Sequence, residues 1–150
     1  MKKKQLPIHI IASWNEVSRE QYVAYYGERA LQNDSVFAAA DRIAVVILDP
    51  LILELQSIEK GDYLIFNLLD ENEYMVKTSS VNRGKASSMR GQVVNTSGGA
   101  LYLSVHEGKA LASLEIAEHN LHCLVKYNQA SQKHYLFKIP MDKIIRPLKR

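Results

Sequence analysis

The sequence predicts a mainly β protein of the α+β class: an antiparallel β-meander that forms a barrel or a sandwich, preceded by a short N-terminal helix. From Gly61 onward, β-rich apolar runs recur about every 10 to 12 residues, a spacing typical of sandwiches and barrels. Clusters of Gly, Asn, Asp and Ser separate these runs and mark turns. Apolar and polar residues alternate within several runs, as expected for strands with one buried face.

The segment before Gly61 has a more helical character. Two successive capping-box patterns, Ser-x-x-Glu from Ser13 and Ser-x-x-Gln from Ser18, predict a short helix. We expect this helix to reach Tyr26 and to end at Gly27, because glycine commonly terminates helices.

A strand and a helical turn are predicted next. Residues 43–48 form a β-branched apolar run, which indicates a strand. Asp49 and Pro50 then predict a helical turn that continues to residue 56, because Asp caps helix N-termini well and Pro suits the first helical position.

The meander is predicted as a series of strands joined by short turns. The strands cover residues 62–69, 73–81, 88–95, 100–106, 109–117, 121–127 and 133–139. Residues 70–72 form a turn of hairpin length. Leu101, Leu103 and Val105 share one face of their strand, which is an ordinary core pattern.

The length of 150 residues fits one domain with one core, and a chain of this size buries roughly two thirds of the surface that its unfolded form exposes. Within residues 1–150 we expect a basic tail at 1–12, which includes a candidate remnant of a secretory signal. Residues 13–60 form the helical and strand lead-in, and residues 61–145 form the meander.

The formal net charge of +3 depends on the two ends of the chain. Six of the 19 basic residues lie there, so the 13 that remain face 16 acidic residues. Phosphate-backbone binding needs a dense basic surface, because each contact neutralises a phosphate and releases counterions. We therefore expect no nucleic-acid partner.

The compartment is not fixed by the residues alone. Cys123 is the single cysteine, so no disulfide framework exists from which an oxidising compartment could be inferred. Three lysines after Met1 resemble the charged part of a secretory signal, but the apolar run at residues 6–12 is short and contains Pro7 and His9. No stretch approaches the roughly 20 apolar residues of a membrane-spanning helix.

The residues that bear chemistry do not assemble into a recognisable catalytic set. No His-Glu-x-x-His motif occurs, and although His119, His122 and Cys123 are close in sequence, His122 and Cys123 point to opposite faces of an extended strand. Cys123 falls on the apolar face, where burial makes a thiol inert. Gly98 and Gly99 lie between two strands, whereas a phosphate-binding loop precedes a helix. We expect no catalytic residue, no metal and no cofactor, and hence not an enzyme.

The N-terminal helix is rich in aromatic residues. Trp14, Tyr22, Tyr25 and Tyr26 either pack this segment onto the sheet or, if several are exposed together, form a surface for a protein partner. The sequence leaves both interpretations open.

The order of strands and turns resembles a known family. The matching residues in the first half are Trp14-x-x-Val17, Gly27-x-Arg29-x-Leu31, Arg42, Leu48-Asp49-x-x-x-Leu53 and the run 64–76. Those in the second half are Ser88-x-x-Gly91-x-Val93, Leu103-Ser104-Val105-x-x-Gly108, Ser113-x-x-Ile116, His134-Tyr135-x-x-x-Ile139 and Asp142. In this order they resemble the N-terminal, non-catalytic domain of secreted bacterial reprolysin-like zinc metallopeptidases and related exoproteins. Ala112 stands where that family usually has Gly, and an aromatic residue expected near Cys123 is missing.

The resemblance implies a propeptide-like module that assists folding of, or occludes, a metallopeptidase domain outside the cytoplasm, extracellular or periplasmic. It also makes Cys123 a candidate thiol for blocking the partner's zinc, and Lys149-Arg150 either a cleavage site or a solvated tail. The alternative is a stand-alone protein-binding or assembly module with the same fold and no link to a protease. The oligomeric state stays open.

Overall fold

The computed structural model describes residues 7–143, and Lys149-Arg150 and the basic residues at 2–4 lie outside this range. Its strands are β1 (Ile8–His9), β2 (Ile11–Val17), β3 (Arg42–Leu48), β4 (Tyr63–Asn67), β5 (Glu73–Asn82), β6 (Ser87–Val93), β7 (Ala100–His106), β8 (Lys109–Ile116), β9 (Leu121–Asn128) and β10 (Lys133–Pro140). Its helices are α1 (Arg19–Tyr26), α2 (Glu28–Leu31), α3 (Ser35–Ala39) and α4 (Pro50–Glu54), with 3₁₀ turns η1 (Ala117–His119) and η2 (Met141–Lys143).

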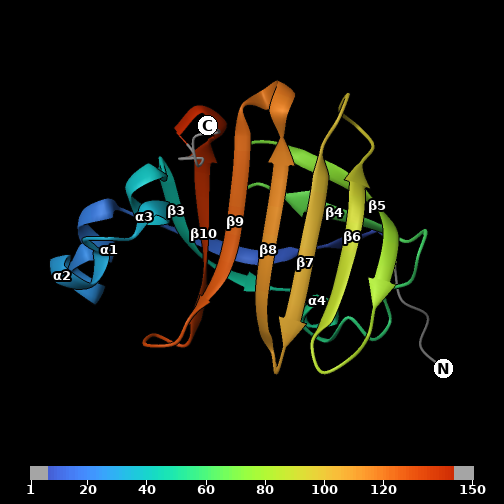
Figure 1. The fold of residues 1–150 in the computed structure, drawn as a ribbon, viewed down its shortest axis with the longest axis horizontal. Helices are drawn as coiled ribbons and strands as arrows, with labels where there is room; N and C mark the ends of the chain where they lie inside the picture. Colours follow the sequence, from blue (N-terminus) through green and yellow to red (C-terminus); the bar gives the residue numbers. More distant parts are fainter. Residues whose placement is uncertain (1–6, 144–150) are drawn as a thin grey trace, which may run out of the picture.

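All the described strands belong to one sheet that nearly closes into a barrel (Figure 1). Strands β4 to β10 form an antiparallel meander, after which β3 and β2 complete the order. At the other end of the sheet, β1 pairs in parallel with β4. Since β1 and β2 are consecutive parts of one segment, that segment touches both ends of the sheet. The prediction of a mainly β fold with barrel-like architecture is confirmed.

Hydrogen bonds at the closure join the first segment to β4. The Ile10 amide donates to the Ile65 carbonyl at 2.9 Å. The side chain of Asn67 accepts from the Ile11 amide at 3.1 Å and donates to the Ile11 carbonyl at 2.7 Å. A side-chain amide thereby continues the ladder for one residue beyond the parallel pairing.

The barrel interior holds the larger hydrophobic core. It takes alternate residues of the strands, such as Leu101, Leu103 and Val105 on β7, as their period-two pattern predicts. Position 91 on β6 requires glycine for a steric reason. A Cβ there would lie 2.9 Å from the Lys77 carbonyl oxygen on β5, which is too close.

A second, smaller core lies outside the barrel, where α1, α2 and α3 cover β10 and the start of β3 (Figure 1). It contains Tyr22, Leu31, Phe37, Ala40, Ile43, Tyr135, Phe137 and Ile139. On β10, Tyr135 and Phe137 face this helical layer while Leu136 faces the barrel, so this strand is buried on both sides.

The helix predicted from Ser13 was wrong at its start. Residues 11–17 form β2, and helix α1 begins only after Ser18. The Ser18 hydroxyl accepts from the Gln21 amide, and the Gln21 side chain accepts from the Ser18 amide, so the second capping box is confirmed. The pattern at Ser13 is overridden because its segment pairs with β3 along its length.

Ile8, His9 and Ile11, assigned to a basic tail from the sequence, belong to the sheet, and the Ile10 amide between them donates to the Ile65 carbonyl. Ile8, Ile10 and Ile11 are buried in the barrel core. Burial of these apolar side chains stabilises the segment in the sheet although its apolar run is short. By contrast, α4 begins as predicted, with the Asp49 side chain accepting from the Leu51 amide at 2.9 Å, but it ends at Glu54 rather than at residue 56.

Candidate binding surface

The histidines and the cysteine that are close in sequence point into different surroundings. The His119 Nδ1 is 2.8 Å from the Tyr74 hydroxyl, and the His122 Nε2 is 2.9 Å from the Ser113 hydroxyl. Cys123 faces the barrel interior. Within residues 7–143, no group of three or more His, Cys, Asp or Glu side chains is arranged to hold a metal ion.

Cys123, the candidate zinc-blocking thiol, is fully buried. Its exposed fraction is 0%, and burial raises the pKa of the thiol well above its usual range. A partner's zinc ion has no access to this sulfur while the barrel is folded.

The aromatic residues of the N-terminal segment fall into three different environments. Tyr22 is only 3% exposed, packs against Phe37 and Tyr135, and has its pKa raised to about 12 by burial. Trp14, on β2, is half-buried against the barrel core. Tyr25, on α1, is 66% exposed. Tyr22 therefore stabilises the helical layer, and Tyr25 is available to a partner.

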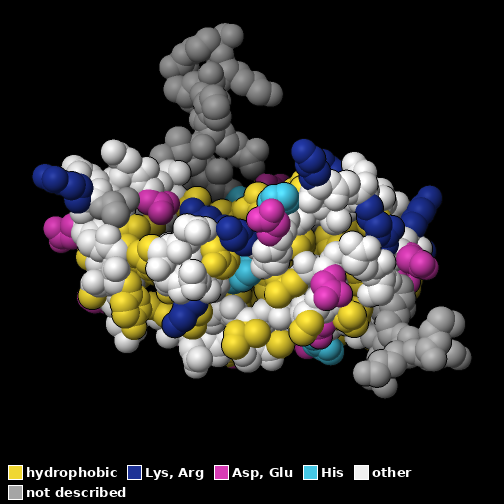
Figure 2. Space-filling model, turned by 90° about the horizontal axis from the view of Figure 1, so that it is seen from below, with side chains coloured by type: hydrophobic (Ala, Val, Ile, Leu, Met, Phe, Trp, Pro, Cys, Tyr) yellow, Lys and Arg dark blue, Asp and Glu magenta, His cyan; other side chains and the backbone are white. Residues whose placement is uncertain are grey.

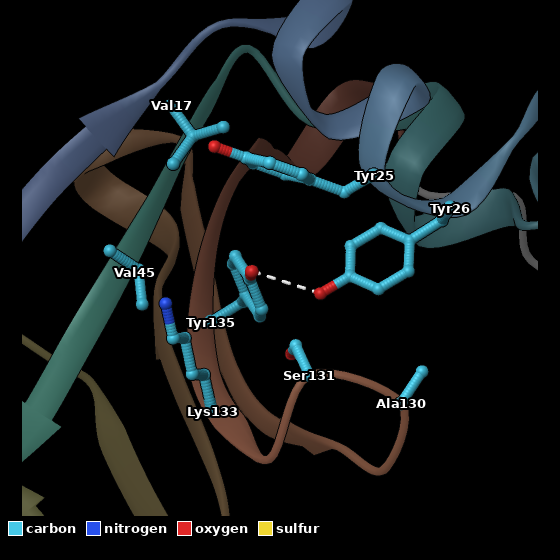
Figure 3. A pocket seen from close by; sticks show the side chains of 8 residues that line it. All are labelled: Val17, Tyr25, Tyr26, Val45, Ala130, Ser131, Lys133 and Tyr135. Atoms are coloured by element: carbon cyan, nitrogen blue, oxygen red, sulfur yellow. Dashed lines mark hydrogen bonds between the residues drawn. The ribbon is translucent and has the colours of Figure 1, made fainter.

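Tyr26 and Tyr25 line a hollow between α1 and the outer face of the sheet (Figure 3). The hollow has a volume of about 290 Å³, and Val17, Val45 and Tyr135 form its floor and walls. The Tyr26 hydroxyl donates to the Tyr135 hydroxyl at 2.9 Å, and burial raises the pKa of Tyr26. Lys133 and the turn residues 130–131 close the opposite side.

A second hollow of about 350 Å³ adjoins the first one. Val45 and Lys133 belong to both, and Trp14, Ile47 and Leu53 are among the residues that line the second. We call the two hollows together, with Tyr25, Val45, Ile47 and Lys133, the β3 surface.

The period of β3 explains why this surface is apolar. Ile43, Val45 and Ile47 point outward from the barrel, and the helical layer buries Ile43. The helices do not reach the end of the strand, so Ile47 is 64% exposed. One row of side chains thus begins in a core and ends on the surface.

A cluster of ion pairs lies at the beginning of β3. The Arg42 guanidinium contacts Glu16 at 2.6 Å, Asp70 at 2.9 Å and Glu71 at 2.6 Å, and Lys138 contacts Glu71 at 2.9 Å. The hydrogen bonds from Arg42 hold the pKa of Glu16 and of Asp70 below their usual ranges. These contacts attach the β4–β5 turn to β2 and β3.

The carboxylates of the β4–β5 turn, Asp70 and Glu71, have ionic partners that the sequence did not reveal. Partial burial opposes ionisation of Glu71, but hydrogen bonds from Lys138 and Arg42 lower its pKa overall. Asp70 and Glu71 are ion-paired structural residues of the turn that was predicted at residues 70–72.

Charged side chains of both signs are mixed on one face of the molecule (Figure 2). On the face shown in Figure 2, Lys and Arg side chains are interspersed with Asp and Glu. That face lacks the dense basic stripe required for binding a phosphate backbone.

Comparison with known proteins gave no further identification: no protein family, curated protein or solved structure was found to match the chain. No helix within residues 7–143 is both long enough and apolar enough to cross a bilayer.

Sequence reasoning identified Tyr25 but missed Val45, Ile47 and Lys133. A signal for the first two was present, since residues 43–48 are apolar on both faces and such strands are covered on both sides or carry an interface. Lys133 gives no such signal, because it comes next to Val45 only through the pairing of β10 with β3.

Proposed function

We propose that the chain is a non-catalytic, propeptide-like binding module that assists folding of, or occludes, a zinc metallopeptidase domain. The observation that carries the proposal is the β3 surface: two adjoining hollows with exposed Tyr25 and Ile47 on a rigid barrel. The resemblance in the order of strands and turns supplies the class of partner.

The geometry suits binding to another polypeptide. Hollows of about 290 and 350 Å³ accept side chains of a partner, and aromatic residues are common anchors at protein interfaces. Beyond Ile11, β2 pairs with β3 alone among the described strands. Its other side can therefore add a strand, a common mode of peptide recognition.

The direct test adds the purified chain to a reprolysin-like zinc metallopeptidase domain and follows cleavage of a quenched fluorescent peptide. A second assay measures the yield of active peptidase after dilution from denaturant, with and without the chain. We expect inhibition in the first assay, a higher yield in the second, or both. An unchanged rate together with an unchanged yield contradicts the proposal.

A matched pair of variants locates the contact. Ile47→Lys places a charge on the β3 surface and is expected to abolish the effect on the peptidase. Leu111→Lys makes the same kind of change on β8, where Leu111 is 45% exposed away from both hollows. Equal loss in the two variants argues against the β3 surface.

The native polypeptide provides an independent test. We expect an antibody against this domain to detect it in the culture supernatant or the periplasm, as part of a larger precursor or after its trimming. Detection of a 150-residue species alone, inside the cytoplasm, favours the alternative of a stand-alone protein-binding module.

A further inference from the structure

We infer that the β3 surface recognises an acidic residue of an extended partner segment, with its carboxylate on Lys133 and apolar neighbours in the two hollows. This inference rests on the proposed function only in taking the β3 surface as the contact face. It goes further by naming the chemistry of the segment that binds.

Lys133 is placed between the two apolar hollows. It is the first residue of β10, it lines both hollows, and its amine points toward Val45 (Figure 3). A carboxylate that contacts this amine is therefore flanked by apolar surface, with Tyr25 toward one end and Ile47 toward the other.

The charge of Lys133 is not balanced within the described part of the chain. No ion pair of Lys133 is found there, and no Asp or Glu lines either hollow. Lys138, by contrast, lies on the same strand and contacts Glu71 at 2.9 Å. A positive charge in a concave, largely apolar site attracts anions more strongly than one on an open surface.

The polar groups around Lys133 also suit a carboxylate. The Tyr26 hydroxyl donates its proton to the Tyr135 hydroxyl at 2.9 Å. The proton of the Tyr135 hydroxyl is not used in this bond and can be donated to a ligand. Ser131 lines the same hollow, but its hydroxyl proton is already donated to the Asn128 Oδ1 at 3.3 Å. Because a carboxylate only accepts hydrogen bonds, an amine and a hydroxyl proton are complementary to it.

An extended segment can present side chains to Lys133 and to both hollows. Residues i and i+2 of a strand lie on one face, about 6.6–6.8 Å apart, so a central Glu can contact Lys133 while apolar residues two positions away point to the same surface. The expected recognition pattern is apolar-x-acidic-x-apolar.

The test is a titration of the ¹⁵N-labelled full chain, followed by NMR, with two blocked peptides. The first is acetyl-Leu-Ser-Glu-Ser-Leu-amide, and the second replaces its Glu by Gln. NMR shift changes report binding even at millimolar dissociation constants. We expect the Glu peptide to shift the amide resonances of Val45, Ile47 and Lys133, and to bind about three- to tenfold more tightly than the Gln peptide.

Variants assign the preference to one side chain. Lys133→Met is expected to make the two peptides bind equally, and Lys133→Glu to favour a peptide with a central Lys. Lys77→Met is the matched control. Lys77 is an exposed lysine of β5 that lies near the Tyr63 ring and outside both hollows. It should keep the preference for the Glu peptide.

Three results overturn the inference: equal affinity of the two peptides for the unaltered chain, shifts confined to another face, or no shifts at millimolar peptide. The peptides require no peptidase, so failure of the proposed function leaves this result intact. Inhibition that persists in Lys133→Glu, together with equal peptide affinities, overturns the acidic contact and leaves the proposed function standing.

Discussion

The two ends of strand β3 differ in how their polar groups are satisfied. At its beginning, Arg42 contacts three carboxylates and is itself mostly buried. At its end, Val45 and Ile47 adjoin Lys133, which has no carboxylate in either hollow. The paired charges at the beginning join elements of one chain, whereas the exposed amine of Lys133 is accessible to a carboxylate of a partner.

This difference predicts that the beginning of β3 stabilises the fold and that its end contributes mainly to binding. Substitutions at the beginning should therefore lower the free energy of unfolding, and those at the end should leave it nearly unchanged.

The largest effect is expected for Arg42→Met. The change leaves Glu16, Asp70 and Glu71 close together without their shared cation, and should lower the free energy of unfolding by about 1–2 kcal/mol, since the pairs are partly exposed. Urea denaturation at neutral pH measures it. The control is Arg90→Met, because Arg90 is exposed and its guanidinium lies over the Tyr102 ring, 4.9 Å from the ring centre; we expect a loss of about 0.5 kcal/mol. Similar losses in both variants would show that the ion cluster has no special role.

The same cluster predicts lower stability in acid. The pKa values of Glu16, Asp70 and Glu71 are lower in the folded chain than the ordinary values near 4, so their contribution is complete above the unfolded pKa. It is lost as the pH falls through the depressed folded values. Urea midpoints measured between pH 6 and pH 3 should fall steeply for the unaltered chain and less steeply for Arg42→Met. Parallel curves contradict this prediction.

A smaller, separate pH effect is expected at His134 on β10, which pairs with Val46 near the end of β3. The His134 Nε2 accepts a hydrogen bond from the Ala110 amide at 2.9 Å, which requires neutral imidazole, and burial lowers the pKa of His134. Its contribution is therefore complete above the unfolded pKa of about 6.5 and is lost as the pH falls from there toward the depressed folded pKa.

The measurement is the unfolding free energy at pH 7.5 and at pH 5.5, compared with that of His134→Gln. We expect the unaltered chain to lose about 1 kcal/mol more than the variant over this interval, since Gln keeps an acceptor but does not titrate. An equal pH dependence would show that His134 remains neutral throughout or that its hydrogen bond is unimportant.

Much of the fold could be predicted because local patterns and tertiary structure agree in the meander. Alternation at Leu101, Leu103 and Val105 places these residues in the barrel, and the Ser18 and Asp49 caps mark the helix starts. Residues 11–17 could not be assigned, because their capping-box pattern is local whereas their pairing with β3 joins residues far apart in sequence.

The candidate site was less predictable than the fold. Tyr25 and Tyr22 are both helical tyrosines in the same short segment, yet one is exposed and the other buried, which depends on where α1 lies on the barrel. Lys133 and Val45 become neighbours only through the β10–β3 pairing. Sequence reasoning about one segment at a time could not find a surface composed of four segments.

The smallest stability effect is expected for Ile47→Lys. Its side chain is already 64% exposed on the outside of the barrel, so its replacement removes little buried apolar area and should change the free energy of unfolding by no more than about 0.5 kcal/mol. Val46→Ala, at the neighbouring buried position, is the control and should lose about 2 kcal/mol, because it removes methyl groups from the barrel core. A loss at Ile47 as large as that at Val46 would mean that the end of β3 is structural. A small loss accompanied by disappearance of peptide or peptidase binding would instead show that the end of β3 acts in recognition.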